Sequence, residues 1–162
     1  MIKKIAIGAL AVAATSALAL SLPTAASASA SAGTSSYDYS SYWGPVYAKH
    51  FQAKSHGWVG VEWDEHQESN TVSVTGRLYD LDSRTYNQGG KCAYVKFQAS
   101  DFDYDWSTVY TKKYCGYPGY KKYAFSEDDV FSLRVKVCQI GPHSSHPTKC
   151  GSWKYLYTAE SE

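Results

Sequence analysis

The chain has 162 residues, with 16 basic and 15 acidic side chains and a formal net charge of +1 at pH 7. This balance argues against a general nucleic-acid binder, because contacts to phosphates require a clear excess of Lys and Arg.

The first 30 residues have the order of a secretory signal peptide. A short basic start, residues 1–4, precedes the nearly uncharged apolar run 5–22, and a tract of small residues follows with Ala-x-Ala sites ending at Ala28, Ala30 and Ala32. This order predicts cleavage near one of those three alanines. A membrane anchor is the alternative, but the run is short and Ala-rich, and no cluster of Lys or Arg follows it. We therefore expect a secreted, extracellular protein with no membrane span in its mature form.

The mature chain is expected to form one domain. Cleavage after Ala30 leaves 132 residues, and loss of Lys3 and Lys4 changes the formal charge from +1 to −1. A chain of this length can bury a substantial core. Residues 31–42 are rich in Ser, Gly and Tyr without apolar periodicity. We expect them to be a flexible N-terminal segment before a domain that spans residues 43–162.

Most of this domain alternates between apolar and polar residues, as half-buried strands do. Clear alternation falls at 59–64, 72–78, 93–98 and 131–138, and shorter runs fall at 108–114, 120–125 and 152–158. Gly, Pro and Asn residues that favour chain reversal separate these runs. The pattern predicts an all-β fold, a small antiparallel β-sandwich or jelly roll of about seven strands, with a closed barrel as the alternative.

The four cysteines are expected to form two disulfides, because an even number in an exported domain is typical of a covalent framework. Three pairings are possible, and we favour Cys92–Cys115 and Cys138–Cys150, since each closes one local excursion between neighbouring strands. By parity, Cys92 and Cys138 fall on the polar faces of their strands, which predicts staples at strand ends outside the core. The spacings lack the Cys-x-x-Cys pairs of zinc ribbons, so no metal or cofactor is predicted.

The most unusual part of the mature chain is a Tyr- and Lys-rich stretch over residues 109–125, with a Gly-Tyr-Pro-Gly turn at its centre. We interpret it as a hairpin. With Val109 and Phe125 inward, parity turns one side of the hairpin to solvent, and the turn adds a tyrosine. The candidate binding residues are Tyr110, Lys112, Tyr114, Tyr117, Tyr120 and Lys122. Exposed aromatic rings and ammonium groups suit sugar rings and anionic groups. The competing interpretation is cross-strand packing that stabilises the hairpin itself.

Acidic and imidazole side chains give weaker signals. Asp101, Asp103 and Asp105 have a spacing that could hold calcium, but Trp106 stands where a calcium loop needs Gly, so a solvated turn is favoured. Two imidazoles lie three residues apart at His143 and His146, with no third metal ligand indicated.

One pair of carboxylates raises the question of catalysis. Glu62 and Asp64 share a strand face and could serve as acid and nucleophile in glycoside hydrolysis. No recognised hydrolase, phosphate-loop or dinucleotide motif is present. An enzyme is therefore the least favoured function class.

The sequence thus predicts a secreted, non-catalytic protein that binds an extracellular polysaccharide or cell-envelope polymer through the Tyr/Lys hairpin. The first alternative is an inhibitor of a secreted enzyme, which would present the loop 142–147 between Cys138 and Cys150. The second is a small glycoside hydrolase that uses Glu62 and Asp64. Neither a nucleic acid nor a cofactor is among the expected partners.

Overall fold

The computed structural model describes residues 37–159. The predicted signal peptide and residues 31–36 of the predicted flexible segment lie outside this range. The strands are β1 (Tyr39–Tyr47), β2 (Ala53–Trp63), β3 (Asn70–Asp80), β4 (Cys92–Ser100), β5 (Trp106–Tyr114), β6 (Tyr120–Asp128), β7 (Ser132–Ile140), β8 (Pro147–Thr148) and β9 (Lys154–Thr158). Two single 3₁₀ turns, η1 (Lys49–Phe51) and η2 (Tyr86–Gln88), complete the elements. Between residues 37 and 159 no helix is long and apolar enough to cross a membrane.

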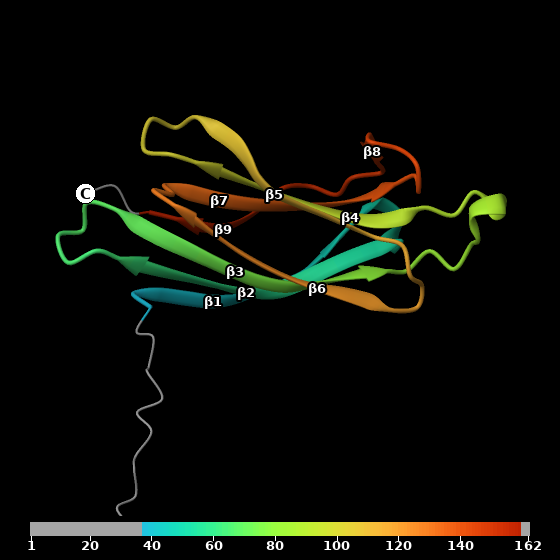
Figure 1. Ribbon diagram of the computed structural model, residues 1–162, viewed down its shortest axis with the longest axis horizontal. Coiled ribbons are helices and arrows are strands. Elements are labelled where there is room, and N and C mark those ends of the chain that lie inside the picture. Colours follow the sequence, from blue (N-terminus) through green and yellow to red (C-terminus); the bar gives the residue numbers. More distant parts are fainter. Residues whose placement is uncertain (1–36, 160–162) are drawn as a thin grey trace, which may run out of the picture. The chain divides into compact units, whose positions relative to one another are not determined.

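The strands form two antiparallel sheets that face each other, which confirms the all-β prediction (Figure 1). Sheet A has the order β1-β2-β3-β6, and sheet B has the order β5-β4-β7, with β8 and β9 both paired to β7. The chain runs through β1, β2 and β3 as a meander and crosses to sheet B for β4 and β5. It then returns to sheet A for β6 and enters sheet B again at β7. The result is a sandwich-like arrangement of two layers.

The core lies between the sheets and consists of the alternating apolar residues that the sequence indicates. The fully buried ones include Val59, Val61, Val72, Val74, Leu78, Val95, Phe97, Leu133, Val135 and Val137. Burying one such side chain stabilises a fold by about 1.5–3 kcal/mol. Because this core fills the space between the inner faces of β2, β3, β4 and β7, we look for a binding surface on an outer face, an edge or an end of the sheets.

Strand β1 corrects the predicted boundary between flexible segment and domain. It begins at Tyr39 and pairs with β2 from Tyr39–Val61 to Tyr47–Lys54, so residues 39–42 belong to the fold. Its Trp43 side chain is 5% exposed and packs on Phe97 with ring centroids 5.7 Å apart. The register shifts after Trp43, at Gly44-Pro45. This bulge breaks the alternation that would have revealed the strand, and an edge strand tolerates Pro at such a site.

Both predicted disulfides are present. Cys92 at the start of β4 bonds to Cys115 just after β5, and Cys138 on β7 bonds to Cys150 before β9. Cys92 and Cys138 are buried, yet they do not belong to the main apolar cluster between the sheets. The bonds therefore staple strand ends and connections, as their parity indicates.

A buried carboxylate holds the long β3–β4 connection. Asp82 is 2% exposed and accepts hydrogen bonds from the Arg84 guanidinium (2.7 and 2.8 Å), from the Lys91 N–H (3.0 Å) and from Gln139 Nε2 (3.0 Å). The Arg84 side chain holds the pKa of Asp82 well below its usual range. The neighbouring Asp80 accepts the N–H of Gly116 (3.0 Å), and burial raises its pKa. These two carboxylates tie the β3–β4 connection to β7 and to the β5–β6 connection.

Candidate binding site

The Tyr/Lys stretch does not form a hairpin. Strand β5 is an edge of sheet B and β6 is an edge of sheet A, so the Gly-Tyr-Pro-Gly turn carries the chain from one sheet to the other. The six predicted binding residues are consequently divided between two layers. Sequence parity could not reveal this, because a hairpin and a crossover between sheets have the same alternation and the same turn residues.

The members on β5 point toward the other sheet. Tyr110 stacks on Phe125 with ring centroids 4.6 Å apart and planes 7° apart, and it also packs near Phe97 and Tyr123. Partial burial raises the pKa of Tyr110. Its inward position follows from a bulge between Phe97 and Gln98, which leaves Val109 without a partner and places Tyr110 opposite Phe97.

The same shift turns the next two candidates inward. Lys112 lies opposite the core residue Val95, and Tyr114 lies opposite Ala93. The Tyr114 hydroxyl donates to the Gly116 carbonyl over 3.0 Å, and its ring packs against the core. Tyr110 and Tyr114 therefore contribute to packing, and they form no exposed platform.

The remaining candidates are exposed. Tyr117 in the turn is 53% exposed, and Tyr120 on β6 is 43% exposed. Tyr120 and Lys122 lie on the outer face of sheet A, the face opposite the core. There Tyr120 packs on Tyr79 of β3 with ring centroids 5.1 Å apart, and the Arg77 guanidinium lies over the Tyr120 ring at 5.1 Å.

The register of sheet A arranges this outer face in rows across the strands. One row consists of the His56 imidazole on β2 and two cations, Arg77 on β3 and Lys122 on β6. The next row holds Trp58, Thr75 and Ala124, and Tyr42 on β1 extends it beside Trp58. Large aromatic rings thus stand next to two small side chains, and a row of nitrogen-bearing groups runs alongside them.

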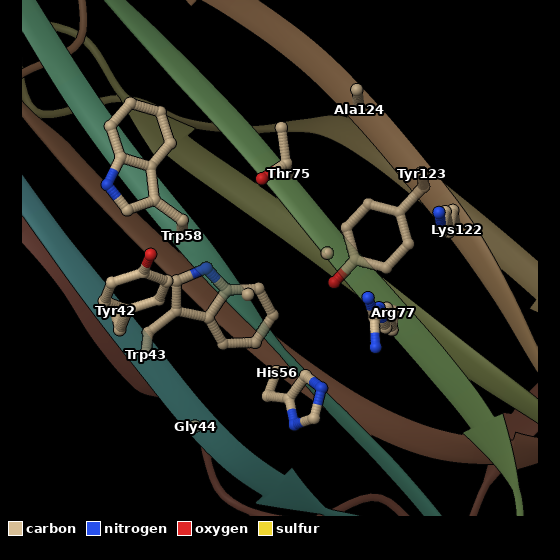
Figure 2. Close-up of a pocket in the computed structure, with 12 residues that line it drawn as sticks. Tyr42, Trp43, Gly44, His56, Trp58, Thr75, Arg77, Lys122, Tyr123 and Ala124 are labelled. Atoms are coloured by element: carbon tan, nitrogen blue, oxygen red, sulfur yellow. The ribbon is translucent and has the colours of Figure 1, made fainter.

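The step from large to small side chains produces a groove of about 880 Å³. Figure 2 shows Tyr42 and Trp43 from β1, His56 and Trp58 from β2, Thr75 and Arg77 from β3, and Lys122, Tyr123 and Ala124 from β6 around it. We call it the sheet A groove. Its volume lies within the range of about 300–1,000 Å³ that is usual for small-molecule sites.

Two glycines lie in the floor of the sheet A groove. Gly57 and Gly76 lie opposite each other in the β2–β3 register. A Cβ on Gly57 would overlap the backbone carbonyl of Thr75, and a Cβ on Gly76 would overlap the ring of Tyr123. The Tyr123 hydroxyl is in turn hydrogen-bonded to the buried Ser55 Oγ at 2.7 Å. The two glycines therefore let the Thr75 carbonyl and the Tyr123 ring pack directly against the backbone beneath the groove.

Two further contacts fix the groove's aromatic wall. The Trp58 ring lies over Gly60, where a Cβ would overlap the indole, and it meets Tyr37 edge to face with centroids 4.6 Å apart. Tyr42 beside it is 87% exposed. One ring is thus held in place while the other is free to meet a ligand.

The polar wall is basic but holds a neutral imidazole. Partial burial, followed by the charges of Lys54 and Arg77, lowers the pKa of His56 below its usual value. Its Nε2 lies 3.3 Å from the Tyr79 hydroxyl. Below the groove, the Nε1–H of the buried Trp43 has no hydrogen-bond partner among residues 37–159. The only salt bridge in that part of the chain joins Arg84 to Asp82, so no carboxylate neutralises Arg77 or Lys122.

Most of this groove could not be predicted from the sequence pattern. Tyr42 fell in the segment expected to be flexible, and His56 and Trp58 precede the run that was recognised as a strand. The signal was present, since His56, Trp58 and Gly60 alternate with residues that face the core. What the sequence could not supply is the register that sets three strands beside Lys122.

A second cavity of about 1,100 Å³ lies at the end of the sandwich-like domain where β2, β4 and β9 finish. Aromatic rings dominate its lining: Tyr39, Trp63, Phe102, Tyr104, Phe131, Tyr155 and Tyr157. The Phe102 ring meets the rings of Trp63 and Phe131 edge to face, and Phe131 packs against the core. Much of this aromatic surface therefore closes the end of the core.

The proposed calcium ligands lie beside this cavity, in the β4–β5 turn. Asp101 Oδ1 accepts the N–H groups of Asp103 and Asp105, each at 3.0 Å, and so closes its own turn. Across residues 37–159 no three His, Cys, Asp or Glu side chains are grouped so as to hold a metal ion. The geometry favours the structural interpretation of this acidic turn.

The carboxylate pair predicted for glycoside hydrolysis is also engaged locally. Asp64 accepts the N–H of Glu68 at 2.8 Å and the Ser69 hydroxyl at 3.2 Å, within the β2–β3 turn. The Glu68 N–H is the main cause of a lowered pKa for Asp64. A general acid needs the opposite, a carboxyl group whose pKa is raised. Glu62 lies on the exposed face of β2.

The loop proposed for an inhibitor is tied down at its start. Lys113 Nζ donates to the carbonyls of Gly141 and Pro142, and the His143 ring meets Tyr86 edge to face at 5.5 Å. His146 bonds to Ser144, and neither histidine belongs to a metal cluster in the described part of the chain. The loop is thus exposed, Lys113 holds its start, and the Cys138–Cys150 disulfide closes it.

Comparison of the chain with models of known protein families, with curated proteins and with solved structures finds no match. Function is therefore inferred from the chemistry of the sheet A groove itself.

Proposed function

We propose that the mature chain is a secreted, non-catalytic binding protein, built on a disulfide-stapled β-sandwich, that holds a polysaccharide chain in the sheet A groove. One observation carries the proposal. The exposed ring of Tyr42 and the fixed ring of Trp58 line one side of the sheet A groove. A row of nitrogen-bearing side chains, His56, Arg77 and Lys122, lines the other side.

The chemistry of the two walls suits a sugar polymer. Sugar rings present apolar C–H faces that pack on indole and phenol rings, which supply large contact areas at a low cost in side-chain entropy. The hydroxyl groups of a sugar accept hydrogen bonds from Arg77 and Lys122. A neutral His56 offers them one N–H donor and one nitrogen acceptor. Because the floor is fixed by backbone and the Trp58 ring by Tyr37, little ordering is needed on binding, and preorganisation of this kind favours affinity.

An extracellular location supports this choice of ligand. The leader has the order of an export signal, and all four cysteines are paired in disulfides, which persist in oxidising compartments. A secreted protein meets polysaccharides of cell surfaces and of the medium, and an open face of a sheet can follow such a chain without enclosing its ends.

The test is depletion of purified mature protein from solution by insoluble cellulose, chitin, xylan and bacterial cell-wall fractions. We expect at least one of these to retain the native protein and Trp58→Ala to weaken retention about ten-fold or more, as is usual when a central aromatic contact is truncated. Tyr104→Ala is the matched control, since Tyr104 is 62% exposed and lies at the other cavity. Equal loss in both variants, or no loss with Trp58→Ala, would refute the assignment.

An enzyme inhibitor remains the second candidate, because one observation favours it. The loop 142–147 is exposed, is closed by Cys138–Cys150 and is anchored by Lys113 at its first carbonyls. A restrained loop of this kind binds with less loss of entropy than a free one. Inhibition of secreted proteases or glycosidases that is lost with Ser145→Trp, while polysaccharide retention persists, would favour this function.

A further inference from the structure

The strands of sheet B contain no acidic residue. Strands β4, β5, β7 and β9 carry six cations and neither Asp nor Glu, and Lys96, Arg134 and Lys136 lie on the outer face of the sheet. The other three are Lys112, Lys113 and Lys154. Between residues 37 and 159 the acidic residues lie just before β1, in sheet A, in the turns and in the β3–β4 connection. We propose that the outer face of sheet B is a second binding surface, whose ligand is an anionic polysaccharide. This inference does not depend on the sheet A groove.

The register of sheet B gathers like charges on that outer face. Lys96 of β4 lies directly opposite Lys136 of β7, and Arg134 is the next outward residue on β7. Like charges in directly opposed positions destabilise a sheet. Burial, followed by the charges of Arg134 and Lys96, lowers the pKa of Lys136. An arrangement that costs stability and lacks a counter-charge is typical of a surface that meets an anion.

Aromatic rings hold these cations in position. The Arg134 guanidinium lies 3.7 Å from the centre of the Trp106 ring and 4.6 Å from that of Trp153, and Lys136 Nζ lies 4.2 Å from the centre of the Trp153 ring. Gln98 Oε1 accepts two hydrogen bonds from Arg134, at 2.8 and 3.2 Å. Rings and amide orient the charges without neutralising them, so they stay available to an external anion.

The ligand class follows from which groups remain free. A nucleic acid would need the faces of exposed rings for its bases, whereas Arg134 and Lys136 already cover faces of Trp106 and Trp153. Free N–H groups of Arg and Lys are good partners for carboxylate and sulfate groups. A polymer that repeats such a group at every sugar or every second sugar complements a row of cations along β7 and β4.

The test uses two soluble anionic glycans, polygalacturonate for carboxylates and heparin for sulfates, with single-stranded oligo-dT as the competing polyanion. The change is Lys96→Gln/Lys136→Gln, and the matched control is Lys49→Gln/Lys121→Gln, which removes two exposed cations from other surfaces. Titration calorimetry of the mature protein at about 0.1 M salt should show the first variant binding on the order of ten-fold more weakly, with a shallower salt dependence, because two fewer counterions are released. The control should stay within two-fold of the native protein.

Binding of either glycan with this pattern supports the proposal and identifies the anionic group. Failure of both glycans to bind, unchanged affinity in Lys96→Gln/Lys136→Gln, or tighter binding of oligo-dT than of both glycans would overturn it. The double variant should unfold at no lower temperature than the native protein, because it relieves like-charge repulsion. The single Lys96→Gln variant repeats the binding test with one charge removed in place of two. Trp58→Ala should leave this binding intact, so failure here and failure of the sheet A groove are distinguishable.

Discussion

Replacing Asp82 by Asn should destabilise the domain strongly although it changes little in size. Asp82 is almost fully buried and accepts five hydrogen bonds, three from Arg84, one from the Lys91 N–H and one from Gln139 Nε2. In D82N one carboxylate oxygen becomes an amide that donates, so donors on that side lose their acceptor.

The expected loss can be worked from these contacts. Each buried donor left without a partner costs about 1–3 kcal/mol. If the amide nitrogen replaces Oδ2, three donors lose their acceptor: the Lys91 N–H, Gln139 Nε2 and Arg84 Nη2. The first two correspond to about 2–6 kcal/mol. The Arg84 side chain is 44% exposed, so its ion pair with Asp82 adds little after solvent screening. A loss of about 3 kcal/mol should lower the midpoint of thermal unfolding by roughly 10–15 °C for a domain of this size.

The pH dependence gives a second readout. The pKa of Asp82 is depressed in the folded state by Arg84. Its contribution to stability is therefore complete above the unfolded-state value, about 3.9, and is lost as pH falls through the folded value. The stability advantage of the native protein over D82N should consequently be constant near neutral pH and should shrink below about pH 4.

Thermal and urea unfolding followed by circular dichroism provide the assay, with Asp103→Asn as the control, because the exposed Asp103 side chain makes no hydrogen bond in the described part of the chain. Surface substitutions of this kind stay within about 0.5 kcal/mol of the native protein. A D82N variant as stable as Asp103→Asn would show that the Asp82 hydrogen bonds do not hold the β3–β4 connection.

Three other outcomes follow from the groove and its surroundings. Gly76→Ala should lower the free energy of unfolding by about 1–3 kcal/mol, because its Cβ meets the Tyr123 ring. It should also abolish polysaccharide retention. Unfolding and depletion assays check both effects, and a stable variant that binds normally would contradict the role of this glycine in the groove. Tyr110→Ala should lower the free energy of unfolding by about 2–4 kcal/mol through loss of its stack on Phe125, as urea unfolding would show. The folded variant should still be depleted by the polysaccharide, and loss of binding would indicate that Tyr110 contacts the ligand. Polysaccharide affinity measured by calorimetry should be constant from about pH 7 to 9 and change only in acid, because His56, with its lowered pKa, stays neutral until the pH is below about 6.5; a change centred above pH 7 would refute its assignment as a neutral group.

Local pattern was sufficient for the core and for the disulfides. Alternation over 72–78 and 131–138 identified strands whose inward residues are buried, since a side chain's face follows from its parity alone. The pairing of Cys92 with Cys115 could be predicted because both lie at the ends of neighbouring strands.

Features that depend on bulges and long-range register could not be predicted. The bulge at Gly44-Pro45 hid β1, and the bulge on β5 reversed the expected direction of Tyr110. The crossover between β5 and β6 divided the Tyr/Lys stretch between two sheets. The sheet A groove needs Gly57 and Gly76 opposite each other and Lys122 beside Arg77, and these pairings join residues far apart in the sequence.

The most direct test of the account is a titration of ¹⁵N-tryptophan-labelled mature protein with soluble cello-, xylo- and chito-hexaose, followed by the indole N–H resonances. The five tryptophans are assigned by single substitution to Phe. The account predicts that one of these sugars shifts the Trp58 resonance and that of Trp43 beneath it, while the resonances of Trp106 on β5 and of Trp153, just before β9, stay unchanged. Shifts confined to Trp63 at the end cavity, or to Trp106 and Trp153, would contradict the sheet A groove as the polysaccharide site.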